Sequence, residues 1–406
     1  MVPNTSPAPP ENRGRLFIFA CGGLFVFGIV MVLLGTLFGM PPMRARLGVS
    51  DMVRQGDLQT LLLFGVFLAT VVAGPLIDRF GNKLVLASSA FLTTVALLGF
   101  AVAGGYSASQ ILGFVLGVGG GGLNMATNVL VSEIFGEARG AKLNLLAVFF
   151  GVGALFIPCA AAVVGSDHMT GVMLVAAVIS AACTVSYLLL PFPPAREASG
   201  FSLREAGKVV RYPGVLLFAS LLFFESGNEA AMIGWTSTWA GALGANAQNA
   251  TLVLALFQAM MMLGRIAASG VLRLITEAQL VMASVAGALL SMIIVARAPS
   301  IPIFVVGVAL GGLTFASIYP TMLAIAGNRF HSFAGTVFSI LFGIGLSGGM
   351  VFPWSIGHLS QARGFRAGMM LPMAGAAMIC SLWMVIRLRA RERAGHGFSR
   401  IDTDEN

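Results

Sequence analysis

Two carboxylates, Glu225 and Glu229, lie within the stretch FFESGNEAAMIGW (223–235), where every other residue is uncharged. Four residues apart, they occupy one face of a helix, one turn above the other. A carboxylate in apolar surroundings must face water, pair with a cation or take up a proton. These groups could therefore bind a proton or another coupling ion, or accept hydrogen bonds from substrate hydroxyls. The alternative is a structural hydrogen bond of a protonated carboxyl to Asn228 or to a neighbouring helix.

The composition indicates that this apolar environment is a membrane. The chain has 406 residues, of which 57% are hydrophobic and only 10% charged, whereas soluble domains carry about 25% charged residues. The net charge of +8 is dispersed between apolar blocks of about 20 residues, the length that crosses a bilayer. We expect no nucleic-acid partner, because the chain offers almost no polar surface for a basic patch.

Twelve apolar blocks predict twelve membrane-spanning helices, since lipid offers the backbone no other hydrogen-bond partners. The predicted spans are 17–40, 59–77, 84–104, 109–132, 142–164, 169–191, 214–241, 250–272, 278–296, 302–326, 334–358 and 366–388. With the N-terminus inside, 18 of the 24 Lys and Arg residues are cytoplasmic, and the six outside are Arg44, Arg46, Arg54, Arg297, Arg363 and Arg366. This bias predicts that both termini are cytoplasmic.

The two halves of the chain repeat each other. GPLIDRFGNK from Gly74 corresponds to GRIAASGVLR from Gly264, and GGLNMATN from Gly121 corresponds to GGLTFASI from Gly311, both at an offset of 190 residues. A duplicated six-helix unit predicts two bundles in parallel orientation with a substrate site near the midplane between them. The predicted organisation is a cytoplasmic tail 1–16, a bundle 17–191, a cytoplasmic loop 192–213, a second bundle 214–388 and a cytoplasmic tail 389–406.

Further polar and aromatic side chains within the spans could line such a site. Amide and carboxyl groups beside aromatic faces suit a polyhydroxylated solute. The predicted substrate-binding residues are Asn124, Asn128, Asn228, Glu229, Trp235, Gln258, Tyr319 and Trp354. Hydrogen bonding between helices is the alternative role for the asparagines, and a position at the membrane interface is the alternative for Trp354.

The segment GPLIDRFGNK fits the G-x-x-x-D-R-x-G-x-[RK] signature, and the chain resembles the major facilitator transporters. The stretches 122–158, 318–330 and 335–359 are similar to the fucose-permease type, the fucose–galactose–gluconate proton symporters. The resemblance implies an all-α fold of twelve helices in two pseudo-symmetric bundles. It also departs from that type: the first helix carries no acid in VLLGTLFG, and Asn124 stands where the fourth helix of that type has an acid. The proton pathway of the type therefore does not transfer residue by residue.

Charged residues at predicted helix ends match the inner gate of the resembled family. The resemblance implies that they clamp the cytoplasmic side closed in the outward-facing state. The predicted gate residues are Asp78, Arg79, Lys83, Glu133, Arg139, Arg265 and Arg273.

The sequence thus predicts a secondary transporter of a sugar or related polar solute, working by proton-coupled symport with Glu229, and less directly Glu225, as coupling residues. The alternatives are a facilitative or sodium-coupled sugar carrier, or a proton-driven exporter of sugars or drugs. We expect a monomer in a bacterial inner membrane, without enzymatic activity, cofactor or metal. GVGGGG (117–122) matches a dinucleotide motif but lies in an apolar span, where glycines serve helix packing.

Overall fold

The computed structural model describes the chain except residues 1–9, 137–138, 194–211, 331–333 and 402–406. Its elements are helices, and the described residues contain no strand. They are α1 (Pro10–Phe38), α2 (Pro41–Arg46), α3 (Met52–Phe80), α4 (Asn82–Val102), α5 (Tyr106–Phe135), α6 (Arg139–Val164), α7 (Met169–Leu189), α9 (Pro213–Ala242), α10 (Ala247–Val271), α11 (Glu277–Arg297), α12 (Ile301–Arg329), α13 (Ala334–Arg363) and α14 (Phe365–Ile401).

Twelve of the described helices are long and apolar enough to cross a membrane, which confirms the predicted fold class. Several helices are longer than their predicted spans. Helix α3 begins at Met52 rather than at 59, because the Asp51 carboxylate accepts a hydrogen bond from the Arg54 backbone N–H at 2.8 Å and caps the helix. Helix α1 begins at Pro10 within the predicted tail, and α14 continues as a helix to Ile401. Most of the predicted loop 192–213 lies outside the described residues.

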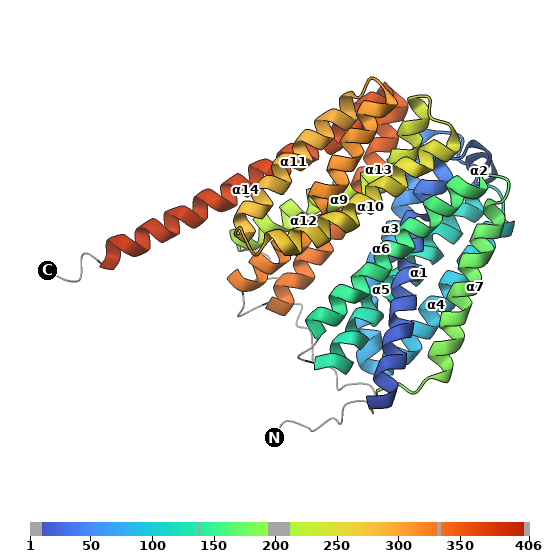
Figure 1. Cartoon of the computed structure of the whole chain (residues 1–406), viewed down its shortest axis with the longest axis horizontal. Helices are drawn as coiled ribbons and strands as arrows, with labels where there is room; N and C mark the ends of the chain where they lie inside the picture. Colours follow the sequence, from blue (N-terminus) through green and yellow to red (C-terminus); the bar gives the residue numbers. More distant parts are fainter. Residues whose placement is uncertain (1–9, 137–138, 194–211, 331–333, 402–406) are drawn as a thin grey trace.

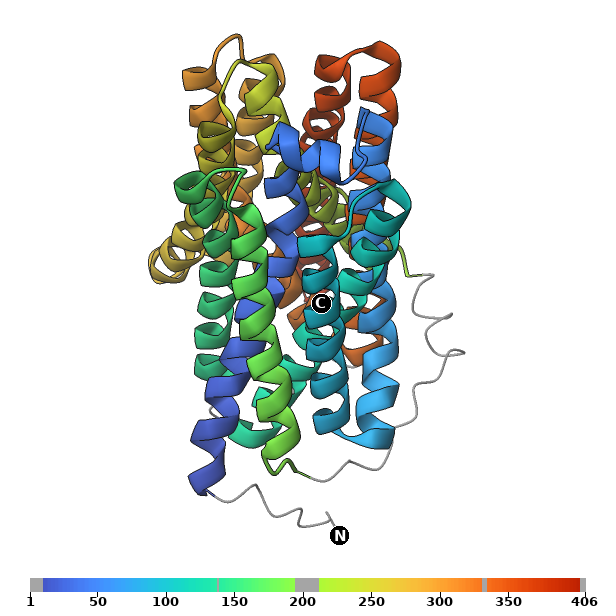
Figure 2. The same ribbon diagram turned by 90° about the vertical axis from the view of Figure 1, so that its right-hand side faces the viewer.

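The helices pack in two groups, α1 to α7 and α9 to α14 (Figures 1 and 2). Within the first group, α3 packs on α5, α1 on α6, and α4 on both α5 and α7. The second group repeats these pairs, with α9 on α13, α10 on α12 and α11 on both α12 and α14. We call these groups the N-terminal and C-terminal bundles.

Glycines allow the backbones of α3 and α5 to approach closely. A Cβ added at Gly117 would overlap the Leu62 carbonyl oxygen, and one at Gly121 would lie 2.6 Å from the Val66 carbonyl oxygen. Small residues at such contacts let membrane helices pack by van der Waals attraction. The glycine run of the dinucleotide-like motif is thus used for helix packing.

The two ends of the molecule differ in how the bundles meet. We call the end that carries α2 and the turn before Asp51 the α2 face, and the opposite end, where α1 begins and α3 meets α4, the N-terminal face. The ribbons of the two bundles lie together near the α2 face and diverge toward the N-terminal face (Figure 1). The two bundles therefore approach each other more closely at the α2 face than at the N-terminal face (Figure 1).

Candidate functional site

Helix α9 places the acidic pair near the middle of its span. Glu225 follows Pro213 by 12 residues, which corresponds to about 18 Å along the helix axis. The Glu225 side chain is fully buried (0% exposed), and neither carboxyl oxygen has a hydrogen-bond partner among the described residues. Glu229, one turn nearer the α2 face, is partly exposed. The two carboxyls are thus adjacent but differ in their access to solvent.

Two polar side chains from other helices lie within electrostatic range of this pair. They are Tyr319 on α12 and Arg265 on α10, each of which interacts with both carboxyls. The sequence predicted Arg265 only as a gate residue, and in the structure its charge also acts on both carboxyls. No ion pair joins Arg265 to either acid in the described part of the chain. Its guanidinium instead lies over the Phe150 ring of the N-terminal bundle, 5.9 Å from the ring centroid.

The polar residues of α5 and α10 lie at comparable depths. Asn128 Nδ2 donates to the Asn124 backbone oxygen at 2.8 Å and to Asn124 Oδ1 at 3.1 Å, and both side chains are partly exposed. Gln258 is 5% exposed, and its Nε2 has no partner in the described structure. Measured along their helices, Asn124, Gln258 and Tyr319 lie about 15–20 Å from the N-terminal face, close to the depth of Glu225.

Two predicted substrate-binding residues do not join this group because they are engaged elsewhere. Asn228 is fully buried against α14, where its amide nitrogen donates to the Pro372 carbonyl at 2.9 Å and its oxygen accepts from the Ala376 N–H at 3.1 Å. Trp235 is fully buried in the core of the C-terminal bundle, with its ring 5.5 Å from that of Phe365. Because their side chains are engaged within one bundle, we remove Asn228 and Trp235 from the candidate site.

Trp354 is more exposed than Trp235 and Tyr319, the other aromatic residues of the predicted site. It is 47% exposed and its ring lies 4.1 Å from that of His358, one turn along α13. By helix rise it is about 30 Å from the start of α13, which places it near the α2 face rather than at the depth of Glu225. This position corresponds to the interfacial alternative that the sequence left open.

Buried amides join the two bundles near the α2 face. Gln55 on α3 donates from Nε2 to the Gly234 carbonyl at 3.1 Å and to Thr238 Oγ1 at 2.8 Å, both on α9. Thr60 donates to the Met350 carbonyl on α13 at 3.0 Å. Gln59 packs against Gly234, with both amide atoms buried and without partners in the described structure. Polar groups thus line the contact between the bundles as well as the midplane.

Close backbone contacts also join the two bundles near the α2 face. A Cβ added at Gly35 on α1 would overlap the Ile233 carbonyl oxygen on α9. One added at Gly56 on α3 would lie 2.6 Å from the Pro353 carbonyl oxygen on α13. Such positions tolerate only glycine without a shift of the helices. The α2 end of the structure is therefore tightly closed.

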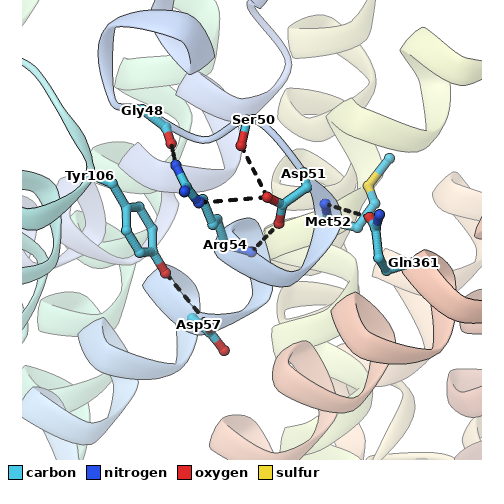
Figure 3. A network of polar contacts seen from close by, with 8 residues as sticks. All are labelled: Gly48, Ser50, Asp51, Met52, Arg54, Asp57, Tyr106 and Gln361. Atoms are coloured by element: carbon cyan, nitrogen blue, oxygen red, sulfur yellow. Dashed lines mark hydrogen bonds and ion pairs between the residues drawn. The ribbon is translucent and has the colours of Figure 1, made fainter.

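A polar network surrounds the start of α3 at the same face (Figure 3). Arg54 forms an ion pair with Asp51 at 3.5 Å, donates to the Gly48 carbonyl at 2.9 Å and lies 4.9 Å from the Tyr106 ring centroid. The hydrogen bond from the Arg54 backbone N–H to the Asp51 carboxylate lowers the pKa of Asp51. The Met52 N–H donates to Gln361 Oε1 at 3.3 Å, across the two bundles (Figure 3).

The predicted gate residues lie at the N-terminal face without a described ion pair across the bundles. Arg79 is exposed and lies over the Phe80 ring of its own helix, and Arg273 is exposed on the C-terminal bundle. Asn82 Nδ2 donates to Glu133 within the N-terminal bundle at 2.8 Å. Asp78 and Lys83 are partly exposed, and the side chain of Arg139 lies outside the described residues.

Gln55 and Gln59 were missed by the sequence analysis. They are one turn apart in RQGDLQT (54–60), before or at the start of the predicted second span. The signal was available as two amides spaced four residues apart, but the predicted span boundary placed Gln55 in a loop.

Comparison with known proteins identifies the family. The model of the Major Facilitator Superfamily matches residues 16–353. The MFS-type transporter YfkL of Bacillus subtilis is 28% identical over 95 residues, which are 23% of this chain and 24% of YfkL. A second Bacillus subtilis protein, YncC, is aligned over only 32% of its length. The curated relatives therefore match short segments.

Solved structures match over nearly the whole chain. A point mutant of the nucleoside transporter NupG has a TM-score of 0.75 at 14% identity and covers 93% of this chain and 99% of its own. A D-xylose–proton symporter has a TM-score of 0.77 at 14% identity, with coverages of 92% and 97%. A point mutant of the E. coli fucose–proton symporter FucP has a TM-score of 0.61 at 16% identity, with coverages of 92% and 99%.

At these identities the structural likeness shows the fold alone, so membership of the fucose-permease type stays a prediction. The family match extends over most of the sequence and agrees with the twelve spanning helices. The chain thus belongs to the Major Facilitator Superfamily and is a multi-pass membrane protein.

Proposed function

We propose that the protein is a proton-coupled transporter of a sugar or related polyhydroxylated solute, of the fucose-permease type. The observation that carries the proposal is the carboxyl of Glu225, which is fully buried and has no described hydrogen-bond partner, one turn from the partly exposed Glu229. An ionised carboxylate in this position would cost several kcal/mol, by the order of magnitude known for unpaired buried charges. The neutral acid avoids that cost, so Glu225 holds a proton in this state.

The two acids have different roles in this proposal. Glu225 is the proton carrier, because its burial links its charge state to the arrangement of helices around it. Glu229 is partly exposed and can accept hydrogen bonds from a solute. Arg265 is within electrostatic range of both carboxyls and offers a positive charge to Glu225 when the proton leaves. The sequence analysis named Glu229 as the first candidate for proton coupling and Glu225 as the second. Because Glu225 is the more buried of the two, we reverse that order.

The proposed solute-binding groups are Asn124, Asn128, Glu229, Gln258 and Tyr319. Amides, a carboxyl and a phenol provide donors and acceptors that match a solute rich in hydroxyl groups. The named structural neighbours include carriers of a nucleoside, xylose and fucose, which share such hydroxyl groups. This common chemistry supports the solute class but does not select one sugar.

The arrangement of the bundles supports alternating access. Since the arginine distribution predicts a cytoplasmic N-terminal face, the closed α2 face is the outer one and this structure is the inward-facing state. In the outward-facing state the gate residues Asp78, Arg79, Lys83, Glu133, Arg139, Arg265 and Arg273 would come together. Release of the proton from Glu225 toward the cytoplasm then accompanies release of the solute.

The proposal is tested by substrate-dependent proton movement in proteoliposomes. A panel of hexoses, pentoses, nucleosides, polyols and sugar acids is first compared by thermal stabilisation of the purified protein. The stabilising solute is then added outside the vesicles without an imposed gradient. Proton symport predicts alkalinisation of the external medium, absent in empty liposomes.

Other outcomes separate the alternatives. Solute uptake without a pH change, and dependent on external sodium, would assign a sodium-coupled carrier. Uptake that needs neither ion would assign a facilitative carrier. Either result would contradict the role proposed here for Glu225.

A further inference from the structure

A cavity lies at the N-terminal face of the C-terminal bundle, outside the proposed solute site. Its volume is about 360 Å³, and it is formed where α9 begins and where α12 and the spanning part of α14 end. Two arginines line it, Arg329 from α12 and Arg389 from α14.

The start of α9 adds to the positive charge of this cavity. Pro213 is the first residue of α9 and has no N–H, and the first intrahelical bond runs from Leu216 N–H to the Tyr212 carbonyl. The N–H groups of Gly214 and Val215 precede that bond, and the N-cap residue Tyr212 gives them no side-chain hydrogen bond. The positive end of a helix favours an anion there. Gly214 lines the cavity directly.

The rest of the lining is apolar or aromatic. It includes Leu217, Phe218, Phe330 and Ile386, with the exposed Tyr212 at the rim. The Phe330 ring lies 6.1 Å from that of Phe218, edge to face. A Cβ added at Gly214 would lie 3.1 Å from the Phe330 ring, so glycine leaves room between α9 and this ring. The cavity therefore combines cationic groups with an apolar wall.

The depth of the cavity decides what this combination suits. The membrane-spanning segments begin at Pro213 and end at Arg329 and Arg389, so the cavity lies where the hydrocarbon core gives way to the headgroup layer. Basic pockets between spanning helices at this level suit lipid headgroups that carry a phosphate. An arginine binds a phosphate through several hydrogen bonds in a fixed planar arrangement.

From this geometry we propose that the cavity binds the phosphate of an anionic phospholipid, with Arg329, Arg389 and the Gly214 N–H as anion ligands and the apolar wall against the upper acyl chain. This site is separate from the proposed solute site and does not depend on the transported solute. The lipid would hold together the ends of α9, α12 and α14, because each supplies one ligand.

The test measures binding of phosphatidylglycerol to the purified full-length protein in detergent. Phosphatidylglycerol is expected to raise the unfolding temperature of the wild type, whereas phosphatidylcholine is not. The double variant R329Q/R389Q is expected to bind phosphatidylglycerol about thirtyfold more weakly, since each arginine contributes about 1 kcal/mol. The matched control is R387Q, since Arg387 lies two residues from Arg389 but packs over the Trp383 ring, outside the cavity.

The outcomes distinguish a lipid from a soluble phosphate. If glycerol phosphate at the same phosphate concentration stabilises the wild type as strongly, the occupant is a soluble anion and the lipid assignment fails. If R329Q/R389Q and R387Q respond to phosphatidylglycerol as the wild type does, the site itself is refuted. Should the double variant not fold, R389Q alone decides the question, because Arg389 is exposed and its replacement leaves the core intact.

Discussion

The two ends of the molecule bring the bundles together by different chemistry. At the α2 face, glycines let backbones touch and Gln55 bonds across the bundles. At the N-terminal face, Asp78 and Arg273 are at least partly exposed and no described ion pair joins them. The α2 face is thus closed by close backbone packing and buried amides, whereas the N-terminal face carries charged side chains. Substitutions at the two ends should shift the conformational equilibrium in opposite directions.

The largest shift is expected from Gly35→Leu. The added side chain overlaps the Ile233 carbonyl, and overpacking of this kind costs about 1–3 kcal/mol, or roughly five- to 150-fold in the equilibrium. The α2 face should therefore open. The opening is measured by the labelling rate of a single cysteine placed at Gln59, with the thiol reagent added outside. The background lacks the four native cysteines.

The control for this substitution is Gly171→Leu, because a Cβ at Gly171 meets no atom within 4 Å. It should leave the labelling rate unchanged. Equal labelling of Gly35→Leu and the control would show that the contact at Gly35 does not hold the α2 face closed.

A smaller shift in the same direction is expected from Gln55→Ala. The variant loses the two buried hydrogen bonds that Gln55 Nε2 donates to α9 and the one that Gln55 Oε1 accepts from Thr238. A hydrogen bond is worth about 1 kcal/mol, so the open fraction should rise about tenfold or more. Thr60→Val loses one bond and should give about a fivefold rise. The labelling rate of the same cysteine tests whether Gln55→Ala opens the α2 face more than Thr60→Val does. Equal labelling rates of the two variants would contradict this order.

Asp51→Ala should reduce stability rather than shift the equilibrium. The variant removes the N-cap of α3, typically worth about 1 kcal/mol, and should lower the unfolding temperature in detergent. Because the Arg54 N–H lowers the pKa of Asp51 in the folded protein, its stabilisation is present above the unfolded pKa of about 3.9 and is lost as the pH falls further. The difference between wild type and variant should therefore shrink in acid; a constant difference would exclude the ionised cap.

The smallest effect is expected from Asp78→Asn, at the other end. If charges close the N-terminal face, the variant favours the state described here by about 0.3–1 kcal/mol, the magnitude of a charge at a helix end, and slows turnover. Glu277→Gln is the control, since Glu277 lies in the first turn of α11 at the same face. Unchanged cysteine accessibility at both faces of Asp78→Asn would count against a charged gate.

The sequence predicted the helices because span length and apolar character are local properties. It also identified the acidic pair, because two carboxylates are easily recognised in a stretch that is otherwise uncharged. Which face of α9 meets which neighbour depends on residues far away. The Asn228 amide bonds to α14 at the Pro372 carbonyl and the Ala376 N–H, and nothing near Asn228 in the sequence shows this.

Side-chain reach and helix ends were harder to predict for the same reason. Arg265 acts electrostatically on both acids, although it lies several turns nearer the end of its helix, and its position along the sequence did not indicate this. Gln55 entered the bundle contact because Asp51 starts α3 seven residues earlier than the apolar pattern suggested. Capping residues therefore carry information that hydropathy alone does not.

The most direct test of the account compares accumulation with exchange in proteoliposomes that contain Glu225→Gln. The wild type should accumulate the solute when an inward proton gradient is imposed and should also exchange it across the membrane without a gradient. Glu225→Gln, which is fixed in the neutral form, should exchange the solute but not accumulate it. Accumulation by the variant at the wild-type level would show that the proton is carried elsewhere and would contradict the account.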